Sequence, residues 1–96
     1  MSTETELWTP GQLDRYRRAL NEAWEQFEEV YYTTIKRVGL QSMAAIHAKR
    51  YRERGRMIKS MAEGLLARPT RTEETPDAIR KAVAELLQFR RNLNEL

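Results

Sequence analysis

The chain has 96 residues, which is enough for one small domain, and it contains no cysteine, which excludes disulfides and thiolate metal sites. Hydrophobic residues make up 41% and charged residues 32%, a balance typical of a folded helical protein and too apolar for general disorder. The start, "MSTETELW", lacks the features of a secretory signal, and no apolar run approaches the ~20 residues of a membrane span. We therefore expect residues 1–96 to form a single cytoplasmic domain whose first eight residues, 1–8, are flexible.

Charge is distributed unevenly along the chain, whose formal net charge is +3. Residues 1–35 carry seven acids and three bases, whereas residues 36–59 carry eight bases and one acid. Residues 60–96 carry six of each. A strongly basic middle segment thus follows an acidic one, which favours partners or neighbouring copies of opposite charge.

The first helix is predicted over residues 9–38. Thr9 can cap it, Pro10 suits its first position, and Gln12 stands where a capping box needs it. The apolar residues that follow fall within an arc of about 140° on a helical wheel, the width of a core-facing stripe. Gly39 suits the end of the helix because glycine accepts a positive φ. Trp8 should pack back on the bundle beside Leu13, as a hydrophobic staple.

The second helix is predicted over residues 40–67, ending before Pro69, with a polar loop over residues 68–75. Glycines at 55 and 64 weaken this helix, and a kink at Gly55 is an option. One face carries most of the apolar side chains and is expected to face the core: Leu40, Met43, Ala44, His47, Tyr51, Ile58, Met61, Ala62 and Leu65.

A third helix is predicted over residues 76–95, with Thr75 as its cap and Pro76 at its first position. No stretch alternates apolar and polar residues over a useful length, so no strand is expected. The predicted fold class is all-α: a long antiparallel hairpin that reverses at Gly39, with the shorter third helix docked on it as in a three-helix bundle. The alternative is one bent rod through Gly39. We favour the hairpin because both apolar stripes need a partner.

A basic ridge lies on the predicted outer side of the second helix. Its four members fall within about 80° of one another on the wheel: Lys49, Arg52, Arg56 and Lys59. They form either an ordinary solvated face or a surface that binds nucleic acid or another polyanion. Acidic side chains at Glu22, Glu25 and Glu29 stand on the first helix at the same height, so charge-guided self-association is a further option.

The bend around Gly39 is predicted to expose apolar side chains, because a third helix of about twenty residues spans only ~30 Å. Aromatic residues and methionine are enriched in protein interfaces. The expected partner-binding set is Tyr31, Tyr32, Ile35, Val38, Leu40 and Met43.

The sequence offers little for catalysis or metal binding. His47, the only histidine, lies on the expected inner stripe with Tyr51, and Arg54 at its edge is expected to meet Glu28. These three residues, His47, Tyr51 and Arg54, could line a small-anion or enzyme pocket, but a structural histidine is the preferred interpretation. There is no Glu-x-x-His pair and no glycine-rich phosphate loop, so we assign no catalytic residue, metal or cofactor.

These features predict a non-enzymatic interaction or assembly protein that self-associates and binds a macromolecular partner. The chain is short and cysteine-free and has long charged amphipathic helices, which is a general style seen in phage virion and host-interaction proteins. If the protein is encoded by a phage, it would be located in the virion. The alternatives are polyanion binding through the basic ridge and a small-anion binder or enzyme around His47 and Arg54.

Overall fold

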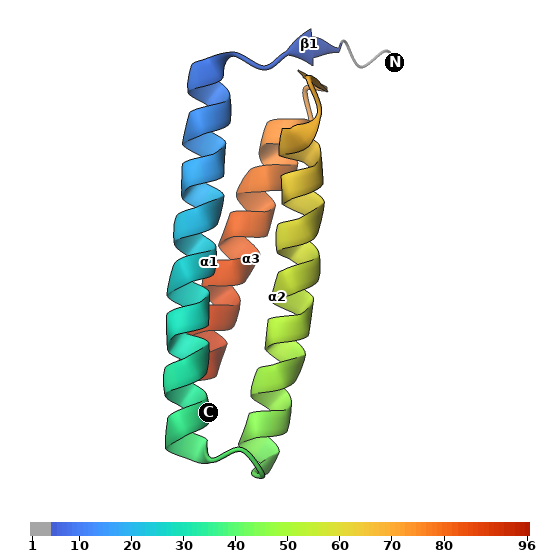
Figure 1. Cartoon of the computed structure of the whole chain (residues 1–96). Coiled ribbons are helices and arrows are strands. Elements are labelled where there is room, and N and C mark those ends of the chain that lie inside the picture. Colours follow the sequence, from blue (N-terminus) through green and yellow to red (C-terminus); the bar gives the residue numbers. More distant parts are fainter. Residues whose placement is uncertain (1–4) are drawn as a thin grey trace.

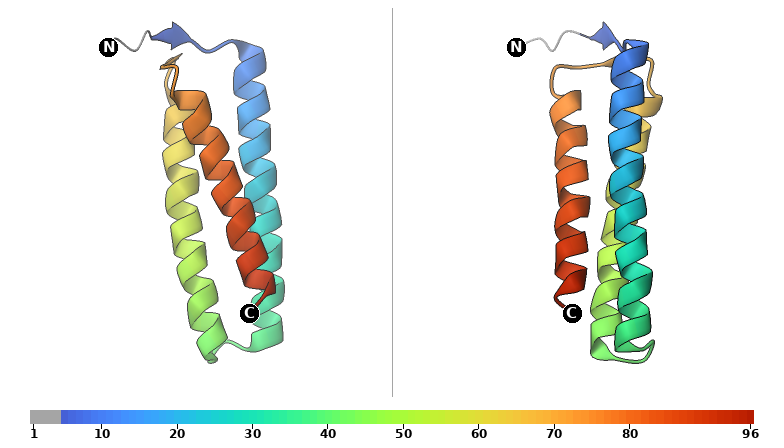
Figure 2. Two further views of the ribbon diagram at one scale, coloured as in Figure 1. Left: turned by 180° about the vertical axis from the view of Figure 1, so that it is seen from behind. Right: turned by 90° about the vertical axis from the view of Figure 1, so that its left-hand side faces the viewer.

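Within residues 5–96, the part of the chain that the computed structural model describes, three helices form an elongated bundle of 49 × 26 × 17 Å (Figure 1). Helix α1 spans Pro10–Val38, α2 spans Met43–Ala67 and α3 spans Thr75–Asn94. Helices α1 and α2 form the antiparallel hairpin, and α3 packs against both along one side of it (Figure 2). The predicted all-α, bundle-like fold is confirmed.

The chain reverses at Gly39, as predicted. Gly39 has a φ of +85°, a conformation that favours glycine, and its backbone N–H donates to the carbonyl of Ile35 at 2.9 Å. The Ser42 hydroxyl then caps α2 by accepting a hydrogen bond from the backbone N–H of Ala45 at 3.1 Å. Helix α2 therefore begins at Met43 rather than at residue 40, because residues 40–42 must leave the helical conformation for the chain to turn back. The single-rod alternative is wrong.

The two other helix starts differ in how well the sequence predicted them. At α1, Thr9 and Gln12 form the expected capping box, with both hydrogen bonds at 3.2 Å. At α3, the expected cap Thr75 is instead the first helical residue, and Glu74 at the cap position makes no side-chain hydrogen bond to the helix. The buried Thr75 hydroxyl accepts a hydrogen bond from the backbone N–H of Thr72 at 3.0 Å, so it fixes the preceding turn.

A two-stranded antiparallel pair, β1 (Glu6–Leu7) with β2 (Thr70–Arg71), joins the segment before α1 to the loop before α3. An Arg71 Nη2–Glu6 Oε2 ion pair of 3.0 Å reinforces it. The expectation of no strand is therefore wrong: two residues per strand are too few to show an alternating pattern. The predicted flexibility of residues 1–8 stays a prediction. Residues 1–4 lie outside the described part, and residues 5–8 include β1 and lead into α1.

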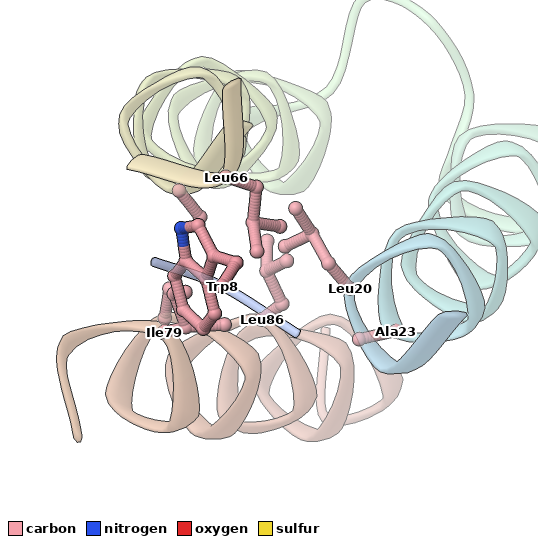
Figure 3. Packing of buried hydrophobic residues seen from close by; sticks show 8 residues of the cluster. Trp8, Leu20, Ala23, Leu66, Ile79 and Leu86 are labelled. Carbon is pink, nitrogen blue, oxygen red and sulfur yellow. The ribbon is translucent and has the colours of Figure 1, made fainter. Parts of the chain in front are cut away.

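Two clusters of buried side chains form the core. The first lies at the end of the bundle near β1, where Trp8, Leu66 and Ile79 point toward one another (Figure 3). Trp8 is only 7% exposed and meets the ring of Tyr16 edge-on at 5.7 Å. Leu13 packs against the same cluster, in line with the expected staple. The second cluster, nearer the bend, contains Phe27, Tyr31, Ala48 and Leu93.

The face that α2 turns to the core overlaps the predicted one only in part: Ala62 is buried, and Tyr51, Ile58 and Leu65 pack against the core. The buried residues of α2 are all small except Leu66, and they follow one another at intervals of three, four and seven: Ala45, Ala48, Gly55, Ala62 and Leu66. Several residues of the predicted inner stripe are instead exposed, among them Met43, His47 and Met61. Small residues fit at these positions because α2 packs closely against α1 and α3. A Cβ at Gly55 would stand 3.3 Å from atoms of Leu86, Phe27 and Trp24. Helix α2 runs through Gly55 without interruption.

Candidate interaction surfaces on α2

Large apolar side chains line the side of α2 that points away from the bundle. The outer α2 face, as we define it, consists of Met43, Ile46, Arg50, Arg54, Met57 and Met61, all exposed and within about 80° on the helical wheel. Met57 is 73% exposed, Met43 68%, Met61 52% and Ile46 43%. Helix α2 therefore has two apolar faces: one of mostly small side chains inside the bundle and one of large side chains in solvent.

A shallow groove between α2 and α3 extends this outer face. It has a volume of about 360 Å³ and a largely apolar lining that includes Ile58, Met61 and Ala82, with Lys81 and Glu85 at its α3 side. Met61 belongs both to the groove and to the outer α2 face. Methionine side chains adapt to irregular partners because they are unbranched and polarizable, which suits such a surface to docking another helix.

The predicted partner set at the bend is divided between core and surface. Tyr31 is buried in the second core cluster beside Leu93, and Ile35, which packs against that cluster, is half-buried, as is Val38. Leu93 is fully buried there, and the Thr34 hydroxyl donates a hydrogen bond to its carbonyl at 3.4 Å. The remaining members of the set are exposed: Tyr32, Leu40 and Met43.

The sequence reasoning missed Ile46 and Met57 as surface residues. The signal was present, since Met43, Ile46, Met57 and Met61 follow one another at helical spacing and form a stripe of their own. The wheel of α2 carries two apolar stripes, and the interpretation with a single stripe assigns Met43 and Met61 to the core.

Three of the four predicted anion-binding residues do come together. Lys49, Arg52 and Arg56 line a concavity of about 270 Å³ between α1 and α2, together with Tyr31 and Glu53. The fourth member of the basic ridge lies elsewhere: the Lys59 ammonium stands over the ring of Trp24 at 5.4 Å and pairs with Glu63 at 3.2 Å.

Arg52 is the most constrained of these basic residues. Its guanidinium carbon lies 5.3 Å from the ring centroid of Tyr31 and 5.8 Å from that of Tyr32. Its Nη2 donates to the Tyr32 hydroxyl at 3.3 Å and to Glu28 Oε2 at 3.4 Å, and its side chain is 28% exposed. Arg54 was expected to meet Glu28, and that prediction is wrong because two residues turn the helix by about 200° and place Arg54 on the outer face.

The remaining charges of the concavity have no ion-pair partner among the residues that the structure describes. Lys49, Glu53 and Arg56 are exposed, and across residues 5–96 none of them takes part in an ion pair. On α1, the acidic residues Glu22, Glu25 and Glu29 are exposed as predicted.

The small-ligand set does not converge. His47 and Arg54 are exposed, whereas Tyr51 is half-buried and packs against the ring of Phe89 at 5.4 Å. The expected inward position of His47 is therefore wrong. Among the described residues, no three His, Asp or Glu side chains lie together in a way that could hold a metal ion.

Comparison with known proteins finds no matching family model, no similar curated protein and no similar solved structure. Among residues 5–96, none of the helices combines the length and the apolar character needed to cross a bilayer. A function must therefore be argued from the surfaces of this molecule alone.

Proposed function

We propose that this protein is a non-enzymatic helical interaction protein that self-associates and binds a macromolecular partner through the outer α2 face. The observation that supports the proposal is the set of exposed apolar side chains on a helix whose other side already packs in the core: the pair Met43 and Ile46 and the pair Met57 and Met61. Large apolar side chains that gather on one exposed helix face mark interaction sites, whereas scattered single residues do not.

The chemistry of the surface defines the partner. Full burial of one Met or Ile side chain contributes about 1.5–3 kcal/mol, so covering these side chains can drive association. Arg50 and Arg54 lie between the two pairs, and Lys81 stands beside the adjoining groove. The surface therefore fits an amphipathic helix that carries carboxylates beside its apolar stripe.

Photo-methionine labelling tests this proposal directly, because three of the four methionines of the chain lie on the outer α2 face. The protein is labelled in the cells that produce it, irradiated, and its cross-links are mapped by mass spectrometry. We expect adducts at Met43, Met57 and Met61. The control carries leucine at these three positions and a single new methionine, Glu25→Met, on the exposed side of α1. Equal cross-linking of the control, or no adduct at α2, would contradict the proposal.

A second candidate function, polyanion binding, is supported by the concavity that contains Lys49, Arg52 and Arg56. Binding of a fluorescent single-stranded oligonucleotide should weaken steeply between low and moderate salt, because each phosphate contact releases counterions. Docking through the outer α2 face should barely change with salt. Lys49→Ala with Arg56→Ala should reduce oligonucleotide affinity and its salt dependence, whereas the exposed control Lys81→Ala should not. Identical affinities of all variants would remove this candidate.

A further inference from the structure

The outer α2 face and the neighbouring Glu53 together carry apolar, basic and acidic side chains that can pair with those of a second copy. We infer that this face pairs with the same face of a second copy of the chain, with the two α2 helices antiparallel, an inference that rests on the proposed function and specifies one partner. The relevant residues follow the alternating three- and four-residue spacing of a coiled-coil seam: Met43, Ile46, Arg50, Glu53 and Met57. This seam is separate from the inner face of α2, which the bundle already occupies.

One antiparallel register pairs Ile46 with Met57 and joins the two charged members of the seam, and it sets Met43 opposite Ser60. When Ile46 faces Met57 of the second copy, Arg50 faces Glu53 of the second copy, because both pairs are centred between residues 51 and 52. The two-fold axis repeats each contact. The interface therefore has two Arg–Glu pairs at its middle, flanked on each side by an Ile–Met contact.

Arg50 and Glu53 are free to make these contacts. Both are exposed, and within residues 5–96 neither takes part in an ion pair or a side-chain hydrogen bond. A parallel pairing of the same seam would set Arg50 against Arg50 and Glu53 against Glu53. Like charges at facing seam positions are destabilising, so the charge pattern selects the antiparallel orientation.

Gly64 fits the same arrangement. It is exposed on α2, and a Cβ added there would meet nothing within 4 Å, so packing inside the bundle does not require a glycine. In the inferred register Gly64 lies beyond the start of the second copy's α2 at Met43, on the side of its bend, where Leu40 is 68% exposed. A residue without a side chain allows this bend to approach α2 closely.

The flanks of the interface oppose association. Lys49 of one copy lies on the same side as Arg56 of the other, and these like charges repel across the edge. This repulsion weakens the dimer, so its mass must be measured by sedimentation equilibrium over a concentration series that reaches about 500 μM, where even an affinity near the millimolar end of the scale is detected.

Charge reversal tests the inferred register. Arg50→Glu alone sets acids against acids at the middle of the seam, and Glu53→Arg alone sets bases against bases. We expect each variant to raise the dimer dissociation constant at least about tenfold, which corresponds to about 1.4 kcal/mol. An equimolar mixture of the two variants should dimerise again, because the two acids of one chain then face the two arginines of the other. Exposed sites on α1 provide matched controls, Arg15→Glu and Glu25→Arg, which should leave the dimer unchanged.

Three results would overturn the inference: a wild-type chain that is monomeric at the highest concentration, single variants that dimerise as well as wild type, or a mixture that fails to restore the dimer. Circular dichroism confirms that each variant is folded, which is expected because both side chains are exposed. A monomeric wild type whose methionines still cross-link to another macromolecule would remove the second copy as partner and leave the proposed function in place.

Discussion

Two glycines of α2 are expected to respond in opposite directions to replacement by alanine. A methyl group at Gly55 would stand 3.3 Å from atoms of Leu86, Phe27 and Trp24, and two of these neighbours, Leu86 and Phe27, are fully buried and cannot move out into solvent. A methyl group at Gly64 would meet nothing within 4 Å. Both positions lie inside the same helix, so each substitution gains the same helix propensity, and only the packing differs.

The expected changes in the free energy of unfolding follow from two contributions, helix propensity and packing. Alanine is favoured over glycine inside a helix by about 1 kcal/mol, and overpacking of a tight core costs about 1–3 kcal/mol. Gly64→Ala should therefore raise the free energy of unfolding by about 0.5–1 kcal/mol. Gly55→Ala should lower it by about 1 kcal/mol, since the unfavourable contact involves three neighbours at once and exceeds the gain in propensity.

Urea and thermal unfolding measure the difference, and for a domain of this size each 1 kcal/mol shifts the Tm by about 4–8 °C. Both substitutions are compared in a Met57→Lys background, where a charge on the outer α2 face removes any contribution from self-association. If Gly55→Ala stabilised the protein as much as Gly64→Ala, then α2 would not lie against α1 and α3 as closely as described, and the explanation of its small inner residues would fail.

Three further substitutions test the bundle itself by thermal and urea unfolding. Trp8→Ala should lower the free energy of unfolding by about 3 kcal/mol because the buried indole closes one end of the core, and a loss below about 1 kcal/mol would show that this end is open. Arg52→Ala should lower the free energy of unfolding by about 1–2 kcal/mol because it loses its packing on two tyrosine rings. The control Arg56→Ala removes an exposed side chain and should change it by no more than about 0.5 kcal/mol, so equal effects would contradict the description of Arg52. Ser42→Ala should cost about 1 kcal/mol by removing the cap of α2, and an unchanged midpoint would mean that the cap contributes nothing.

Both bounds of α1 were predictable because local chemistry sets them, whereas the start of α2 at Met43 and the cap of α3 were not predicted correctly. Thr9 and Gln12 form a capping box from adjacent side chains, and Gly39 ends α1 because its backbone accepts a positive φ. Such signals act over three or four residues and do not depend on what the helix later packs against. The number, order and approximate length of the helices could therefore be read from the amino-acid sequence, and so could the reversal between α1 and α2.

The orientation of α2 was decided only by the tertiary structure. On a helical wheel, the most hydrophobic face is expected inside, and by that criterion Met43 and Met61 would be buried. In the bundle, side-chain size decides which face is buried, because closely packed helices leave room for alanine and glycine but not for methionine. A Cβ at Gly55 would stand 3.3 Å from side chains of both neighbouring helices, and the orientation of α2 that buries Gly55 turns the methionines toward solvent. The candidate interaction surface is thus a consequence of how tightly the core closes, which depends on three helices together.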